Sequence, residues 1–150
     1  VYQDRDGYIW ISTRNWLFQY DGYSITTYKS NLYRPDLLTN NNIYCVAEDA
    51  QHRLWIGTYS GLNVLDKQTG QIRKIDDSEI NGIGISQILV TSENRILFAT
   101  EGGLLEYLED SNRFLAFNQD NTDGVFSKTT VKSLFEDDRG DIWIGTWSQG

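Results

Sequence analysis

A five-residue pattern recurs four times along this chain of 150 residues and constrains its fold more than any other feature. The clearest copies read Leu-Trp-Ile-Gly-Thr at 54–58 and Ile-Trp-Ile-Gly-Thr at 142–146. The central residues stand at positions 10, 55, 97 and 143, so successive copies lie 45, 42 and 46 residues apart. A period of this length is typical of repeat proteins, in which each repeat is one structural unit. The chain is therefore expected to be an array of similar units.

Three further positions repeat at fixed distances from the centre of the pattern. A hydrophobic residue stands twelve positions earlier in three copies, an acid six positions earlier in three of the four, and Leu seven positions later in three. These residues are Ile43, Ile85 and Val131; Asp4, Asp49 and Asp137, with Thr91 in the third copy; and Leu17, Leu62 and Leu104. Agreement at four offsets indicates that the whole repeats are related.

Each repeat contains short segments rich in Ile, Val, Tyr, Trp and Thr, and turn residues separate them. Asp6-Gly7 and Asp21-Gly22 are strong hairpin signals, because Gly tolerates the positive φ that a tight turn requires. Four short antiparallel strands every ~45 residues are typical of a β-propeller blade. A β-sandwich could hold as many strands, but it does not explain identical motifs at fixed offsets.

We therefore predict an all-β protein, a β-propeller fragment of about three and a half four-stranded antiparallel blades. The predicted blades span residues 1–28, 43–75 and 85–117, with a half blade at 130–146. The Trp at the centre of each pattern is expected to fill the space between blades, and the Gly two residues later to let the next sheet approach closely. A closed ring needs about four to eight blades. The chain is therefore expected to be cut from a longer protein and to self-associate through its open sheet faces.

Charge and cysteine content argue against a nucleic-acid-binding protein and against a small scaffold held together by disulfides. The chain has 13 basic and 21 acidic residues, a net charge of −8, whereas affinity for nucleic acid comes mainly from Lys and Arg. The single cysteine, Cys45, can form no internal disulfide, and its apolar strand context predicts a buried, inert thiol. No apolar stretch approaches the ~20 residues of a membrane helix.

Residues 48–62 and 136–146 resemble the two-component regulator propeller repeat. That repeat has an acid, a turn, a Leu-Trp-Ile-Gly-Thr core and a Gly-Leu pair two residues later. The first copy departs from it at Ser12 and Trp16, and the third lacks the acid and the Trp but keeps Gly103-Leu104. The signatures of WD40 and kelch blades are absent from the sequence.

The resemblance implies a function that composition and spacing do not show. Repeats of this family form periplasmic sensor regions of inner-membrane hybrid two-component sensor histidine kinase/response regulator proteins, often in Bacteroides-like bacteria. Their ligands are often oligosaccharides, and further propeller blades of the same chain are the expected neighbours. The kinase and receiver modules are not in these residues, so this segment is expected not to be an enzyme.

The residues themselves favour the same conclusion about catalysis. The single histidine, His52, stands in a polar turn without a partner for a metal site, and no nucleophile or phosphate-binding motif is present. The acid pairs Asp76-Asp77 and Asp137-Asp138 stand at turns, where Asp normally bonds the local backbone. We therefore predict no catalytic residue, no metal site and no cofactor.

Binding is the better hypothesis, and the connection between the second and third strand of each blade is the candidate site. This connection and the loop between blades should open on the same face. Equivalent places hold aromatic, basic and acidic side chains, which suit a sugar: aromatic rings stack on its apolar face and polar groups bind its hydroxyls. The candidate ligand-binding residues are Arg14, Trp16, Tyr59, Glu101 and Trp147.

Three functions remain open at this point. The first is a ligand-sensing, oligosaccharide-binding segment that passes a conformational bias to a kinase. The second is a propeller that serves as a platform for protein interaction or dimerisation, without a small ligand. The third, a lyase-type propeller enzyme, would need a catalytic His or acid cluster at one mouth, and a single His in a turn argues against it.

Overall fold

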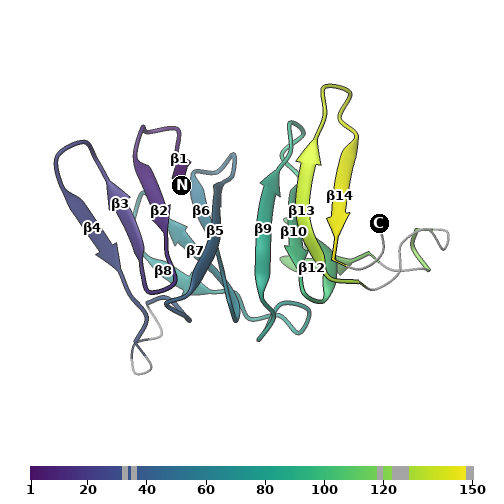
Figure 1. Ribbon diagram of the computed structural model, residues 1–150, viewed down its shortest axis with the longest axis horizontal. Helices are drawn as coiled ribbons and strands as arrows, with labels where there is room; N and C mark the ends of the chain where they lie inside the picture. The colour runs from purple at the N-terminus through teal and green to yellow at the C-terminus, as the bar shows by residue number, and fades with distance from the viewer. Residues whose placement is uncertain (32–33, 35–36, 118–119, 123–128, 148–150) are drawn as a thin grey trace.

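The computed structural model describes residues 1–31, 34, 37–117, 120–122 and 129–147. Its strands form three four-stranded sheets and one two-stranded sheet, which stand side by side in chain order (Figure 1). Within each sheet, strands that follow one another in the chain are antiparallel neighbours. The predicted all-β propeller architecture of about three and a half blades is therefore confirmed.

The strands have the following bounds. Blade 1 contains β1 (Tyr2–Gln3), β2 (Ile9–Ser12), β3 (Leu17–Tyr20) and β4 (Ile25–Tyr28). Blade 2 contains β5 (Ile43–Glu48), β6 (Arg53–Thr58), β7 (Gly61–Asp66) and β8 (Ile72–Lys74). Blade 3 contains β9 (Ile85–Val90), β10 (Ile96–Thr100), β11 (Gly103–Leu108) and β12 (Arg113–Ala116). Blade 4 contains β13 (Val131–Glu136) and β14 (Ile142–Thr146). Among the described residues, no helix is long and apolar enough to cross a bilayer.

The repeated acid builds the turn between the first and second strand of its blade. One oxygen of Asp49 accepts hydrogen bonds from the backbone N–H groups of Gln51 and Arg53, and the other accepts bonds from the indole of Trp55 and the Arg53 guanidinium. Asp4 and Asp137 accept the same two backbone bonds and the same indole bond. The acid and the Trp therefore recur together because they hold one turn. The expectation that Asp137 bonds its local backbone is confirmed.

The same turn requires a left-handed residue three positions after the acid. Gly7 and Gly140 take φ values of 88° and 84° there, and His52 and Asn94 take 59° and 61°. Gly adopts this conformation without strain, and Asn and His are among the few other residues enriched in it. His52 is thus placed by the turn geometry of its repeat.

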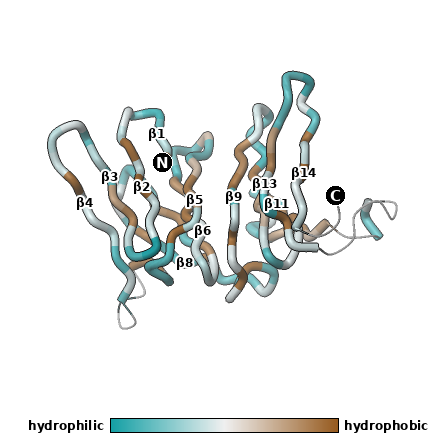
Figure 2. The backbone as a smooth tube through the Cα atoms, in the orientation of Figure 1, coloured by the Kyte–Doolittle hydropathy of each residue, from teal (hydrophilic) through white to brown (hydrophobic). Residues whose placement is uncertain are grey.

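Hydrophobic cores lie between successive blades. Trp55 is fully buried between blades 2 and 3, with ring centroids 5.6 Å from Phe98 and 4.9 Å from Tyr107. A Cβ added to Gly57 would lie 2.9 Å from Cγ2 of Ile85, so the small residue allows the next sheet to approach, as predicted. Figure 2 shows hydrophobic residues along the strands and hydrophilic residues at the hairpin tips.

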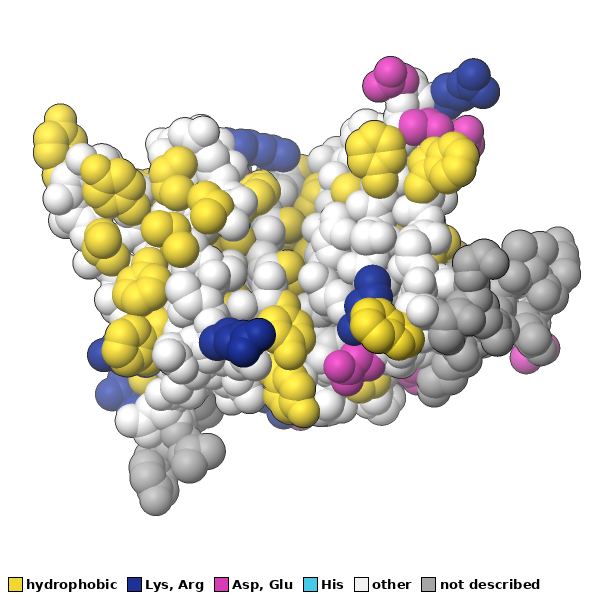
Figure 3. Space-filling model, in the orientation of Figure 1, with side chains coloured by type: hydrophobic (Ala, Val, Ile, Leu, Met, Phe, Trp, Pro, Cys, Tyr) yellow, Lys and Arg dark blue, Asp and Glu magenta, His cyan; other side chains and the backbone are white. Residues whose placement is uncertain are grey.

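The prediction that each Trp fills the space between blades is wrong for blade 4. Trp10 and Trp55 are 0% exposed, but Trp143 is 64% exposed. No described sheet packs on the outer face of β14, so the ring has nothing to cover it. Figure 3 shows hydrophobic side chains exposed near the tip of the β13–β14 hairpin.

Candidate functional site

The candidate site lies at the end of the sheets that carries the connections between second and third strands, the lower end in Figure 1. The first residue of this connection is Tyr59 in blade 2, Glu101 in blade 3 and Trp147 in blade 4. Their backbone N–H groups donate to the carbonyls of Asn42, Gly84 and Thr130 at 2.9, 3.1 and 3.0 Å. Each of those carbonyls directly precedes the first strand of its blade, so the connection is tied to the innermost strand.

A β-bulge brings one further side chain per blade to this end. The pairing register between the first and second strands shifts at the start of β5, β9 and β13. The residues skipped by the pairing are Tyr44, Ser86 and Lys132. Bulges re-aim side chains and concentrate beside functional sites. The bulge residue and the first connection residue together form the loop-end surface of each blade.

The loop-end surface differs in chemistry from blade to blade. In blade 2, the ring of Tyr44 meets the ring of Tyr59 edge-on, with centroids 6.2 Å apart. In blade 4, the Lys132 ammonium lies 5.6 Å from the centre of the Trp147 ring. Blade 3 presents the Glu101 carboxylate. The scaffold thus repeats, whereas the groups that it presents do not.

A cavity of about 320 Å³ joins the loop-end surfaces of blades 3 and 4. Glu101, Thr130, Lys132 and Trp147 line it. Trp147 is 77% exposed, and Thr130 donates a hydrogen bond to the Glu101 carbonyl at 3.2 Å. The cavity therefore combines an aromatic face, a cation and a carboxylate, a set that can stack on a sugar ring and bind its hydroxyls.

Two of the five predicted ligand-binding residues meet in this cavity, and three do not. Glu101 and Trp147 line it. Tyr59 pairs with Tyr44 in the neighbouring blade, and Trp16 lies under Lys29, whose Nζ is 4.5 Å from its ring centre. Arg14 is exposed and is not among the residues that line the cavity.

Sequence reasoning missed the bulge residues, Lys132 above all. Each follows the repeated hydrophobic residue that opens the inner strand, at a place where an ordinary strand would continue its ladder. The signal was a variable position beside one that is always hydrophobic: Tyr, Ser and Lys after Ile43, Ile85 and Val131. A bulge cannot be recognised from that variation alone, because it depends on the register with the next strand.

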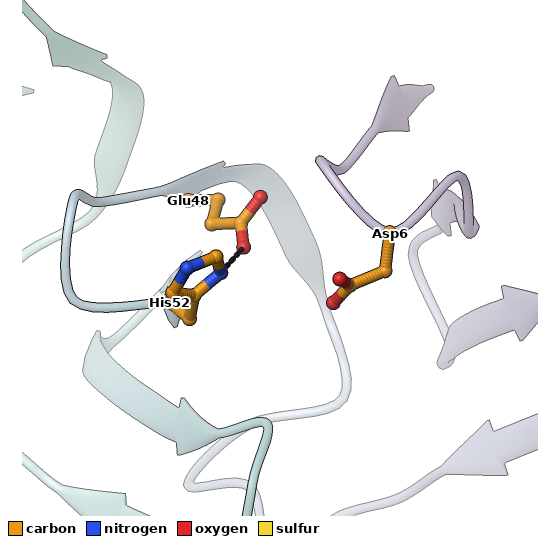
Figure 4. A group of neighbouring side chains, drawn as sticks. All are labelled: Asp6, Glu48 and His52. Atoms are coloured by element: carbon orange, nitrogen blue, oxygen red, sulfur yellow. Dashed lines mark hydrogen bonds and ion pairs between the residues drawn. The ribbon is translucent and has the colours of Figure 1, made fainter.

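The opposite end of the sheets holds His52 in a cluster with Glu48 and Asp6 (Figure 4). His52 Nδ1 lies 3.2 Å from Oε1 of Glu48, and one ligand atom from each of the three residues lies within 4.8 Å of the others. These types of residue can bind a divalent metal. Sequence reasoning considered His52 alone: Glu48 stands four residues before it, but Asp6 is remote in the chain.

The ammonium of Lys67 already occupies the centre of that cluster. Its Nζ lies 2.8 Å from Asp4, 2.6 Å from Asp6 and 2.8 Å from Glu48, and its side chain is only 7% exposed. An ammonium has three donors, and three carboxylates satisfy them. A metal ion would have to displace this buried cation, so the residues do not fit a metal site. The cluster instead joins the first turn of blade 1 to blade 2.

The electrostatics of the cluster follow from these contacts. Burial opposes ionisation of Asp4, but the hydrogen bonds from Lys67 and Trp10 outweigh it and lower the pKa of this carboxyl below its ordinary value. The carboxylates in turn raise the pKa of Lys67 against the effect of burial. The cluster is therefore a charged structural link at neutral pH.

Cys45 offers no nucleophile. Its sulfur lies 3.5 Å from the carbonyl oxygen of Ile85, and burial raises the pKa of the thiol to about 12. The thiolate is the reactive form of cysteine, and it is scarce at neutral pH when the pKa is so high. The thiol is therefore inert, as predicted, although the residue is partly rather than fully buried.

Comparison with known proteins agrees with the repeat analysis. A family model described as two component regulator propeller matches residues 1–15, 37–60 and 124–148. These segments carry the repeated turn and strand of blades 1, 2 and 4. No curated protein matches the chain.

Solved structures share the fold at low sequence identity. The extracellular domain of a putative hybrid two component system from B. thetaiotaomicron is 21% identical over 96% of this chain and 21% of that one, with a TM-score of 0.80. A second such domain from B. thetaiotaomicron is 21% identical over 96% and 19%, with a TM-score of 0.76. Virginiamycin B lyase from Staphylococcus aureus is 15% identical over 95% and 46%, with a TM-score of 0.70. The chain spans about a fifth of the two extracellular domains.

Proposed function

Because the chain carries two-component regulator propeller repeats, we propose that it is a ligand-sensing segment of a two-component system sensor. The ligand class is an oligosaccharide, and the kinase that receives the signal belongs to another part of the parent protein. The segment itself is not an enzyme. Its place is the periplasm, as part of the sensor region of an inner-membrane protein.

The observation that carries the proposal is the cavity at the loop ends of blades 3 and 4. The exposed Trp147 ring offers a stacking face, and the charges of Lys132 and Glu101 stand beside it. Carbohydrates combine apolar C–H faces with hydroxyls, so they suit such a set of groups. The side chains differ between equivalent positions of the blades, whereas the turn recurs in all four and the Trp in three of them. This contrast favours a role in recognition for the variable positions.

Sensing requires more than binding. A ligand shifts a conformational equilibrium only by the difference in its affinity for the two states. The loop-end cavity spans adjacent blades, so a bound chain of sugars would contact both blades and favour one arrangement of the two over another. That is the means by which this segment would bias a downstream kinase.

Calorimetric titration with cellotetraose, xylotetraose and a tetragalacturonate tests the proposal. We expect saturable binding of at least one of them, weakened at least 10-fold by Trp147→Ala and by Lys132→Ala. Tyr23→Ala is the matched control, since Tyr23 is 99% exposed in the β3–β4 turn at the other end of blade 1. Equal affinity of the Trp147 and Tyr23 variants would contradict a site in the loop-end cavity.

A second candidate function is a platform for protein interaction. The exposed aromatic rings of Trp143 and Phe135 on blade 4 favour it, at 64% and 63% exposure. Neither ring belongs to the loop-end cavity. Binding of a partner protein to this segment would be lost in Trp143→Ser and kept in Trp147→Ala, and this difference separates the two functions.

A further inference from the structure

A second cavity, of about 390 Å³, lies in the crevice between blades 1 and 2. Its walls come from β2, β3 and β4 of blade 1 and from β7 of blade 2, and the residues Asp6 and Gly70 border it from two hairpin turns. Those turns are at the end of the sheets opposite the loop-end cavity. The volume falls within the range of about 300–1,000 Å³ that is usual for small-molecule sites.

The equivalent crevice between blades 2 and 3 is closed. There Tyr107 and Phe114 pack with centroids 5.4 Å apart, and Tyr107 lies 4.9 Å from Trp55. Above them the guanidinium of Arg53 forms two hydrogen bonds to Glu109, at 2.9 and 2.6 Å. Large aromatic rings and a bidentate ion pair thus fill the positions between these two sheets that correspond to the first crevice.

At the same positions of the first crevice, the repeat has smaller side chains, or side chains that do not form an ion pair with each other. Counting from Leu62 and Leu104, Leu65 stands where blade 3 has Tyr107, and Ile72 stands where it has Phe114. Tyr8 takes the place of Arg53 and Lys67 that of Glu109. Lys67 forms its ion pairs with the carboxylates of Asp4, Asp6 and Glu48 at the turn end, and Tyr8 offers it no carboxylate. The cavity is therefore a departure from the repeat, and not a general feature of blade packing.

The walls of the cavity are aromatic and carry hydrogen-bonding groups. Tyr8 and Tyr28 are half-buried, and the Tyr28 hydroxyl donates to Oε1 of Gln19 at 2.9 Å. That bond fixes the side-chain amide of Gln19 and leaves its NH₂ group as the donor. Trp10 is fully buried and is held by Asp4 through its indole N–H, so its ring supports Tyr28, 5.5 Å away, from behind the accessible wall. Aromatic walls with an oriented amide and a carboxylate suit a compound that has both C–H faces and hydroxyls.

The charged side chains around the cavity favour a neutral ligand over an anion. The ammonium of Lys67 is surrounded by three carboxylates, so it offers no donor to an anion. The group Asp4, Asp6, Glu48 and Lys67 carries three negative charges against one positive charge, which disfavours an anion near the cavity. We infer that the crevice between blades 1 and 2 is a binding site for a neutral sugar ring. The inference is independent of the proposed oligosaccharide site at the loop ends.

Saturation-transfer NMR and calorimetry with simple glycosides test this inference. The probes are the methyl glycosides of glucose, galactose and mannose, with glucuronate as an anion and choline as a cation. Leu65→Tyr gives blade 2 the ring that blade 3 has and fills the cavity. Gln19→Leu keeps the volume and removes the amide. Tyr23→Ala is the control, because Tyr23 is exposed in a turn outside the crevice.

We expect one neutral glycoside to bind, to lose binding in Leu65→Tyr and to bind at least 5-fold more weakly to Gln19→Leu, with affinity unchanged in Tyr23→Ala. Thermal unfolding checks that Leu65→Tyr is folded. No saturable binding of any neutral glycoside, or equal binding to Leu65→Tyr, would overturn the inference. Preferential binding of glucuronate or choline would also overturn it. A glycoside whose binding is lost in Trp147→Ala and kept in Leu65→Tyr would overturn it too, since it would lie at the loop ends.

Discussion

The carboxylate of Asp49 accepts a hydrogen bond from the indole N–H of Trp55 at 2.6 Å, and both side chains are buried. The same bond joins Asp4 to Trp10 at 2.8 Å and Asp137 to Trp143 at 2.9 Å. In blade 3, Thr91 and Leu97 take the two places, and Thr91 keeps only the bond to the backbone of Arg95. One buried pair thus connects the turn of a blade to the ring that packs against the next blade.

Asp49→Ala is expected to lower the free energy of unfolding by about 2–4 kcal/mol, because it leaves the indole and two backbone N–H groups, together with the Arg53 guanidinium, without their acceptor in the core. Asp137→Ala removes the same three bonds at the exposed turn of blade 4, where water replaces them. It should therefore shift the transition much less. Urea denaturation followed by tryptophan fluorescence measures both. Equal losses for the two variants would show that burial does not set the strength of this turn.

Gly57→Ala is expected to destabilise the protein by about 1–3 kcal/mol through overpacking. The added Cβ would lie 2.5 Å from the Cys45 sulfur and 2.9 Å from Cγ2 of Ile85, on the strand of the next blade. Gly102→Ala is the control, since the nearest contact of its Cβ would be the end of the flexible Ile83 side chain at 3.2 Å. Differential scanning calorimetry compares the two. If the Gly57 variant is as stable as the Gly102 variant, the two sheets can move apart to admit the methyl group without a loss of stability.

Lys67→Met is expected to cost about 3–5 kcal/mol near neutral pH, because Asp4, Asp6 and Glu48 lose the cation between them. The pKa of Asp4 is lowered in the folded protein, so its contribution to wild-type stability is present above its ordinary value of 3.8 and is lost as the pH falls below it. Without Lys67, burial and like charges raise that pKa. The deficit of the variant should therefore shrink between pH 7 and pH 4. Denaturation curves of both proteins across this pH range measure the difference in unfolding free energy. A difference that does not change with pH would show that Lys67 stabilises the protein through packing of its aliphatic chain and not through its charge.

Self-association is expected to depend on the open face of blade 4. Trp143 and Phe135 are mostly exposed, although the Trp10 and Trp55 rings at the position of Trp143 are fully buried by the next sheet. Sedimentation velocity at low and high concentration should show association that the double change Trp143→Ser and Phe135→Ser reduces. Trp147→Ser is the control, since it removes an exposed ring at the loop ends. A monomer at both concentrations in the unmodified chain would refute this expectation.

Much of the architecture was predictable from the sequence because a blade is specified locally. Hydrophobic residues, Asp-Gly turns and the pattern around Trp55 lie within one repeat, and repetition at a fixed period indicates several similar units. The turn acids were also predictable as structural, since Asp137 bonds a backbone only two and four residues away. These features depend on short-range geometry, which a linear pattern records.

The candidate sites needed the tertiary structure, because they depend on contacts between blades. Glu101 and Trp147 were predicted separately, but their common cavity and the part of Lys132 in it follow from a bulge in β13 and from the packing of β9 beside β13. The crevice beside Tyr28 exists because two sheets meet at positions where Leu65 is smaller than its counterpart Tyr107. The sequence by itself determined the blades, their turns and the positions that vary between them. Which variable side chains meet, and where space remains between them, was decided only when the sheets packed, since distance between residues of different repeats is a property of the packed sheets and not of the chain.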